Sequence, residues 1–268
     1  MTYQGLLTRL WSLPALRIPG RTLLHRRLWT VEQGPGAGLK LRFPQNSDYI
    51  SGTSELPVQR EIARRLQRGG VFYDVGANVG FFSLIAGRLV GDQGHVCAFE
   101  PQPRNAAAVA ENARLNDMAH VKVFDVAVGS DTCRDELVMT EWDGGATLSK
   151  FPSGPAAPID RIEVQVVSLD EFIPSRRLPP PTFVKIDVEG AELEVIEGMR
   201  RTIARCRPVL LYEIDDGDRA ELGRRWAELD ARVSSLGYEI VHLENAYPGL
   251  NWNVGHSIGL PAEAAPSV

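Results

Sequence analysis

Short apolar runs alternate with helix-patterned stretches from about residue 58 onward. The run Val71–Val75 has the continuous apolar character of a buried strand, and residues 81–90 after it place apolar side chains at helical spacing. Strands that alternate with helices in this way are typical of a doubly wound α/β fold with a mostly parallel sheet. Further strands are predicted at residues 95–99, 121–124, 182–187, 208–214, 238–243 and 257–260, and further helices at 104–115, 191–203 and 219–236.

Residues 134–167 interrupt this alternation. Two segments with alternating apolar and polar residues, Glu136–Thr140 and Ile162–Val167, flank a long stretch rich in Gly, Pro and Ser. The two alternating segments predict an antiparallel hairpin insertion. The stretch between them is a long loop, and long loops in compact domains are usually functional or mobile. Its tip, with Trp142 as an anchor, either closes over a bound molecule or forms a surface loop without such a role.

The chain divides into an N-terminal extension, residues 1–57, and a domain that carries the sheet, residues 58–268. Five arginines precede the first acidic residue, Glu32, and alternate with leucines and tryptophans. This pattern predicts an amphipathic helical extension, broken where prolines occur. Such an extension either packs on the domain or makes a peripheral contact with a membrane or a carrier protein.

Composition narrows the class of protein. A net charge of −5 gives no general electrostatic attraction to nucleic acid, so no nucleic-acid partner is expected. The three cysteines are odd in number and widely spaced, which predicts neither a disulfide framework nor a thiolate metal site. No apolar run approaches the roughly 18 to 20 residues of a membrane span, and the sequence begins without a recognisable signal peptide. We therefore expect a cytoplasmic protein.

A glycine turn follows the first strand, where α/β proteins bind nucleotide-containing ligands. Gly76 and Gly80 open the next helix, so that backbone N–H groups and the positive helix end face a ligand. Glu100 ends the neighbouring strand, where a carboxylate can accept hydrogen bonds from ribose hydroxyls. A dinucleotide motif has glycine where Asn78 stands, and Asp74 would repel a phosphate but suits an ammonium group. These residues predict a site for S-adenosylmethionine, which carries an adenosine, a sulfonium, an ammonium and a carboxylate.

Three segments carry a resemblance to a known family: Asp74–Gly80, Phe99–Pro101 and Val184–Glu192. They resemble the FkbM-type methyltransferases, over about residues 48–215. The resemblance implies the Rossmann-like fold of class I methyltransferases, with S-adenosylmethionine along the glycine turn and Glu100 on its ribose. It also implies that residues Asp125 to Ala127, after the third strand, lie beside the adenine.

Acidic residues at the ends of adjacent strands are the candidates for the chemistry. A hydroxyl acceptor must lose its proton to a base or bind a metal that lowers its pKa. Asp187 is the candidate base, with orientation of the acceptor as its alternative role. Asp187 and Glu213 together are also candidate ligands for Mg²⁺ or Mn²⁺. The alternative for Glu213 is a hydrogen bond to a loop. Glu189, on the strand face of Asp187, and His256, near the last strand, are further catalytic candidates with structural roles as the alternative.

The sequence therefore predicts an S-adenosylmethionine-dependent O-methyltransferase. The expected acceptor is a hydroxyl on a small molecule, a glycan or a lipid, such as a sugar or a secondary metabolite. An NAD(P)-dependent oxidoreductase is one alternative, although Asn78 and the lack of a Tyr-x-x-x-Lys pair count against it. A catalytically silent, methyltransferase-like binding module is the other, although three acids in one cleft count against it: Asp74, Glu100 and Asp187.

Overall fold

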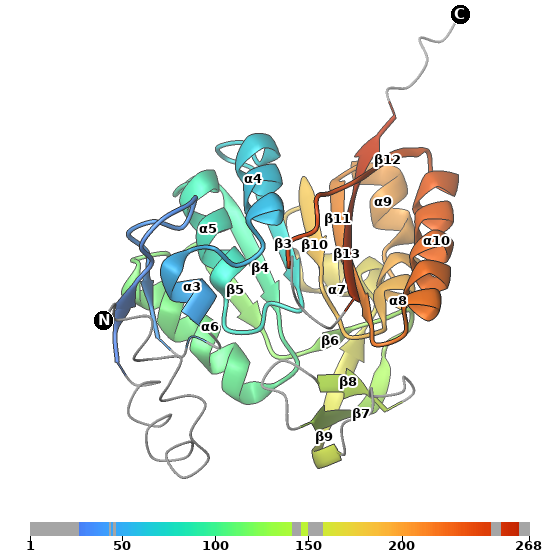
Figure 1. Cartoon of the computed structure of the whole chain (residues 1–268), viewed down its shortest axis with the longest axis horizontal. Helices are drawn as coiled ribbons and strands as arrows, with labels where there is room; N and C mark the ends of the chain where they lie inside the picture. The colour runs from blue at the N-terminus through green and yellow to red at the C-terminus, as the bar shows by residue number, and fades with distance from the viewer. Residues whose placement is uncertain are drawn as a thin grey trace, which may run out of the picture.

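The computed structural model describes residues 27–42, 44, 47–140, 146–149, 158–247 and 253–262. A seven-stranded sheet lies at its centre, in the order β12-β13-β11-β10-β3-β4-β5 (Figure 1). Its strands are β3 (Val71–Val75), β4 (His95–Phe99), β5 (Val121–Phe124), β10 (Phe183–Ile186), β11 (Val209–Asp216), β12 (Tyr238–His242) and β13 (Asn253–Pro261). All neighbours are parallel except β13, which runs antiparallel to β11 and β12. The predicted doubly wound, mostly parallel sheet is confirmed.

Helices cover both faces of this sheet (Figure 1). One face carries α4 (Leu56–Arg65), α5 (Phe81–Val90) and α6 (Pro103–Leu115), and the other carries α7 (Leu169–Arg176), α8 (Glu192–Glu197), α9 (Arg200–Cys206) and α10 (Arg219–Ser235). Successive strand residues point to opposite faces, so Phe72 and Phe183 pack in the α5 core while Tyr73 and Val184 pack in the α9 core. Two hydrophobic layers therefore hold the sheet in place.

The predicted helix 191–203 is wrong in one respect, since the chain forms two helices there. α8 ends at Glu197 and α9 begins at Arg200. A Cβ atom added at Gly198 would lie 1.9 Å from the carbonyl oxygen of Gly129. The backbone of the small sheet thus approaches the chain at this break. The helix α7 was not predicted, because Pro174 lies inside it and proline usually ends a helix.

The predicted hairpin insertion is confirmed, and it forms a second sheet. Its four strands lie in the order β6-β9-β7-β8: β6 (Ala127–Val128), β7 (Cys133–Thr140), β8 (Ala146–Leu148) and β9 (Pro158–Val167). β7 and β9 pair antiparallel, and β6 pairs parallel with β9. Leu137, Leu148 and Val166 give this sheet its own small core. Trp142 lies outside the described residues, so its role stays a prediction.

The N-terminal segment reaches the main sheet. The amphipathic pattern falls mainly on residues 1–26, which lie outside the described residues; the part that follows forms β1 (Trp29–Thr30), β2 (Lys40–Leu41) and the short helix α3 (Ser47–Ser51). The ring of Tyr49 stacks on Phe81 of α5 at 4.8 Å between ring centroids. This segment is therefore packed against the α5 face rather than separate from the domain.

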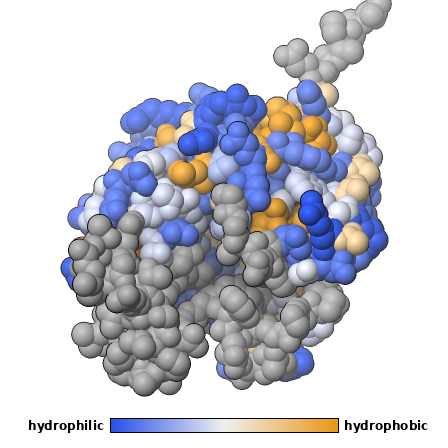
Figure 2. Space-filling view, in the orientation of Figure 1, coloured by the Kyte–Doolittle hydropathy of each residue, from blue (hydrophilic) through white to orange (hydrophobic). Residues whose placement is uncertain are grey.

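The visible surface is mostly hydrophilic. Figure 2 shows small, separate apolar patches among polar and charged residues on one face of the molecule. Among the helices that the structure describes, none is both long enough and apolar enough to cross a bilayer.

Candidate active site

A cavity of about 220 Å³ lies at the carboxyl ends of the parallel strands. The strand order reverses between β3 and β10, and in open α/β sheets ligands bind at this reversal. The walls come from the β3–α5 turn, the ends of β4, β10 and β11, and the small sheet. Tyr49 and Glu55 of the N-terminal segment complete them. The cavity thus brings together residues that the sequence keeps far apart.

The glycine turn packs directly against the end of β10. Gly76 has a φ of +84°, and a Cβ atom there would lie 1.7 Å from the carbonyl oxygen of Asp187. Only glycine can therefore bring this turn so close to β10. Gly80, with a φ of +88°, caps α5 against Val109. Of the predicted turn residues, Gly76 and Asn78 line the cavity, and Gly80 supports the turn from behind.

Glu100 lies in the cavity wall at the end of β4. Its Oε2 accepts a hydrogen bond of 2.8 Å from the Asn78 backbone N–H, and its Oε1 accepts one of 2.9 Å from the Gln102 N–H. Burial raises the pKa of Glu100 to about 7. A carboxylate oxygen has two lone pairs, so each oxygen keeps one for a ligand donor. This arrangement suits a vicinal diol such as that of ribose.

Ala127 lies in the wall near Glu100, whereas Asp125 and Asp74 do not line the cavity. Asp74 was predicted to face the ligand, but it is only 1% exposed and its Oδ2 accepts a hydrogen bond from Ser83 of α5. Burial raises the pKa of Asp74. The structure thus places Asp74 beneath the cavity, because its side chain points into the α5 face of the sheet.

A buried lysine fixes Asp187. Lys185, which is 1% exposed, places its Nζ 2.6 Å from Asp187 Oδ2 and 4.5 Å from the ring centroid of Phe82. Burial alone would lower the pKa of Lys185, but the Asp187 and Glu55 carboxylates raise it above its usual range. Lys185 therefore carries its charge and holds Asp187 in the cavity wall. Lys185 was not among the predicted site residues, although a lysine inside an apolar strand is a signal for a buried partner.

Three buried side chains that could bind a metal, Glu55, Glu213 and His256, meet beside the cavity. His256 Nε2 lies 2.6 Å from Glu213 Oε2 and 3.4 Å from Glu55 Oε2. The Tyr247 hydroxyl donates to Glu55 Oε1 at 2.9 Å. Burial alone would lower the pKa of His256, but the two carboxylates raise it to about 10. The imidazole is thus protonated in this arrangement, which differs from the neutral base that the sequence suggested.

The binding of a metal by Asp187 and Glu213 together stays a prediction. In the part of the chain that the structure describes, the cluster of side chains that could hold a metal is Glu55, Glu213 and His256. Asp187 is not in this cluster, and its carboxylate is bonded to Lys185. No sequence pattern connects Glu55 with the other two, and it was missed for that reason.

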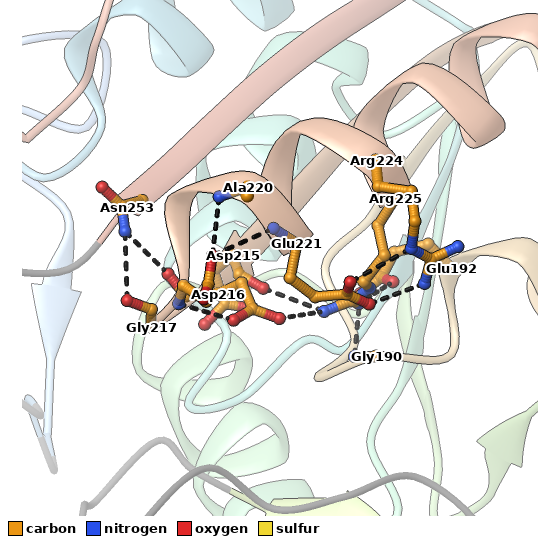
Figure 3. A network of polar contacts seen from close by, with 11 residues as sticks. Gly190, Glu192, Asp215, Asp216, Gly217, Ala220, Glu221, Arg224, Arg225 and Asn253 are labelled. Carbon is orange, nitrogen blue, oxygen red and sulfur yellow. Dashed lines mark hydrogen bonds and ion pairs between the residues drawn. The ribbon is translucent and has the colours of Figure 1, made fainter.

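A polar network shapes the loop that follows Asp187 (Figure 3). The buried Glu192 accepts hydrogen bonds from the Gly190 backbone N–H at 3.0 Å and from Arg225 of α10 at 3.0 Å. Arg225 also donates to the carbonyl oxygen of Asp215 at 3.0 Å. This network holds Glu189 in the cavity wall, where burial and neighbouring acids raise its pKa well above the usual range. Glu189 therefore favours its neutral form.

Comparison with known proteins identifies the family of the chain. Residues 74–240 match the model of the methyltransferase FkbM domain. The hexuronic acid methyltransferase AglP of Haloferax volcanii is 27% identical over 180 residues, which cover 65% of this chain and 71% of that protein. The 2-O-methyltransferase NoeI of Sinorhizobium fredii is 27% identical over 191 residues, 66% of this chain and 77% of that one.

Two further relatives carry the family name. The 31-O-demethyl-FK506 methyltransferase FkbM of Streptomyces tacrolimicus is 32% identical over 203 residues, which cover 66% of this chain and 75% of that protein. A crystal structure of the methyltransferase FkbM from Methylobacillus flagellatus aligns with 93% of this chain and 60% of that chain, at 18% identity and a TM-score of 0.49. Because residues 74–240 match the family model, the chain belongs to the FkbM methyltransferase family and is an S-adenosylmethionine-dependent methyltransferase.

Proposed function

We propose that the protein transfers a methyl group from S-adenosylmethionine to a hydroxyl of a sugar or a secondary metabolite. One observation carries this proposal: a single cavity has Glu100 in one part of its wall and Asp187, Glu55 and Glu213 in another. The first part suits the ribose of a nucleoside, and the second suits removal of a proton from an acceptor. The names of the relatives, which include a hexuronic acid methyltransferase and two O-methyltransferases, support a hydroxyl as the acceptor.

The donor half of the cavity combines the backbone of the glycine turn with the Glu100 carboxylate and small side chains. We assign Gly76 and Asn78 to the donor's amino-acid moiety and ribose, Glu100 to its ribose hydroxyls, and Ala127 to its adenine. When bound, the donor supplies a methyl group on a positively charged sulfur. Glu100 needs its ionised form to accept two hydroxyl hydrogen bonds, and its backbone donors favour that form.

The acceptor half must deal with one proton. As the new O–CH₃ bond forms and the S–CH₃ bond breaks, the bonding electrons stay on sulfur and the hydroxyl proton must leave the acceptor oxygen. Asp187 is the side chain that we assign to this oxygen, because it lies in the cavity wall next to the donor turn. Lys185 acts as a positioning residue, since its ammonium holds the Asp187 carboxylate at 2.6 Å.

The small sheet lines the cavity with apolar side chains. Leu137 and Leu148 line it from β7 and β8, and they pack in one core with Ala127 on the donor side. The insertion therefore borders the donor, and we assign to it a part in acceptor recognition as well, because its apolar side chains suit a sugar ring or a carbon skeleton.

A panel of acceptors tests the proposal. The protein would be incubated with donor carrying an isotopically labelled methyl group and with hexuronic acids, neutral sugars and hydroxylated macrolides, and products would be analysed by mass spectrometry. We expect label on an oxygen in one acceptor class and none with the Asp187→Asn variant. Label on nitrogen or carbon, in every productive case, would contradict the O-methyltransferase assignment.

A further inference from the structure

Three buried side chains from distant segments converge at the acceptor end of the cavity. Glu55 comes from the start of α4, Glu213 from β11 and His256 from β13. Each offers one ligand atom, and these atoms all lie within 4.8 Å of one another. Glu213 and His256 face each other in the pairing of β11 with β13. Glu55 lies outside the sheet and is brought to them by the N-terminal segment.

The spacing of these atoms suits one cation between them. First-row divalent cations take carboxylate oxygen and imidazole nitrogen at about 2.0 to 2.2 Å, which puts neighbouring ligand atoms roughly 2.8 to 3.6 Å apart. The distances from His256 Nε2 are 2.6 Å to Glu213 and 3.4 Å to Glu55. A cation would take the place of the proton on His256 Nε2, which would leave to solvent, and the side chains would adjust to bring both carboxylates to bonding distance.

A second observation concerns the hydrogen bonding of Glu55. Glu55 is 4% exposed, and its Oε2 atom is buried without a hydrogen-bond donor. Buried carboxylate oxygens are normally paired, because desolvation without a partner costs free energy. Oε2 is the atom that faces His256, whereas Oε1 already accepts from Tyr247. Oε2 of Glu55 therefore faces the cluster, with the His256 ion pair as its contact and no hydrogen bond.

The positive charge that faces Glu55 Oε2 is the His256 imidazolium at 3.4 Å, whereas the buried Lys185 pairs elsewhere. Lys185 is bonded to Asp187 at 2.6 Å, on the other strand of the pair β10–β11. Glu55 and Glu213 line the cavity, while His256 lies behind them. A cation held by the three side chains would thus have its remaining coordination positions directed to the cavity.

We propose that Glu55, Glu213 and His256 form a binding site for one first-row divalent cation at the acceptor end of the cavity. The mixed oxygen and nitrogen donors favour Mn²⁺, Fe²⁺ or Zn²⁺ over Mg²⁺, which takes oxygen ligands. The cation's open positions would take the acceptor hydroxyl and lower its pKa, a role that rests on the proposed function. The binding site itself does not depend on that role.

Metal binding can be measured without the methyl donor. The full-length protein would be treated with a chelator, dialysed and titrated with Mn²⁺, and free Mn²⁺ would be followed by electron paramagnetic resonance. We expect one Mn²⁺ per chain, and a loss of affinity of roughly tenfold or more in Glu55→Gln and in His256→Gln. Two surface variants, His242→Gln and Glu228→Gln, should bind like the wild type.

Folding is checked by binding of S-adenosylhomocysteine, which the two cluster variants should retain. The absence of a stoichiometric Mn²⁺ site in the wild type would overturn the proposal, as would equal affinity in Glu55→Gln and the wild type. Either result would mean that the His256 proton alone bridges the two carboxylates. Failure of the wild type to bind S-adenosylhomocysteine would contradict the proposed function instead, whatever the Mn²⁺ result.

Discussion

The two halves of the cavity are built in different ways. The donor half comes from one stretch of sequence, in which Gly76 and Asn78 follow β3 and Glu100 follows the adjacent strand. The acceptor half draws on Glu55 just before α4, Glu213 in β11 and Tyr247 after β12. A short local motif can thus specify a nucleoside site, whereas the acceptor site depends on how distant segments pack.

The energetics of the halves differ as well. The donor half depends on backbone conformation, because the Gly76 turn fits against β10 only without a side chain. The acceptor half depends on charge, because Lys185 and His256 compensate carboxylates that would otherwise repel one another. Changes to the first should alter folding and donor binding, and changes to the second should alter turnover.

The largest expected effect is on stability, from Gly76→Ala. The new Cβ would meet the Asp187 carbonyl oxygen at 1.7 Å, and the φ of +84° disfavours alanine. We expect the free energy of unfolding to fall by roughly 3 kcal/mol or more, measured by denaturant titration. Gly223→Ala in α10 is the matched control, since nothing lies within 4 Å of its added Cβ, and it should be stabilising by up to about 1 kcal/mol. Equal stability of the two variants would contradict the packing argument.

Asp187→Asn should separate binding from turnover. The substitution keeps the shape of the side chain but removes the charge that faces Lys185 and the cavity. Turnover should fall by roughly 100-fold or more, as expected for loss of acid–base catalysis, while S-adenosylhomocysteine affinity stays within about twofold. The exposed Asp131→Asn variant should match the wild type in both assays. Full activity of Asp187→Asn would return this residue to a structural role.

Donor binding should depend on pH through Glu100. Burial raises the pKa of Glu100 to about 7. In the unliganded protein, the Glu100 carboxyl therefore stays protonated from the ordinary pKa of a glutamate up to a pH of about 7. Ribose hydroxyls need the carboxylate, so S-adenosylhomocysteine affinity should decline by up to about tenfold per pH unit below about 7. The stability of the unliganded protein should show the opposite trend, because ionising a buried carboxyl whose pKa is raised costs free energy as pH rises through that window. Titrations of Glu100→Gln should lack this pH dependence.

The sequence predicted the parts of the molecule that are encoded locally. The parallel sheet, the glycine turn and the hairpin insertion follow from periodicity and turn chemistry, and the structure contains all three. The break between α8 and α9 could not be predicted, because Gly198 is required by the approach of a distant strand end. Nothing in a linear pattern indicates such a contact.

The acceptor half shows the same limit. Asp187 and Glu213 were expected at one rim because adjacent parallel strands end there, and both line the cavity. The ion pair between Lys185 and Asp187 was not predicted, because it depends on the direction in which the lysine side chain leaves β10. Glu55 precedes α4 with a φ of +46°, which is unusual for a residue other than glycine, and only the fold reveals that it faces His256.

Calorimetry with S-adenosylhomocysteine tests most directly whether the donor and acceptor halves of the cavity act separately. Glu100→Ala removes the ribose acceptor and should weaken binding by about 1.5 to 3 kcal/mol, the range for hydrogen bonds to a charged group. Glu55→Gln, which changes only the acceptor half, should bind with wild-type affinity to within about twofold. Unchanged affinity in Glu100→Ala, or an equal loss in Glu55→Gln, would contradict this division of the cavity.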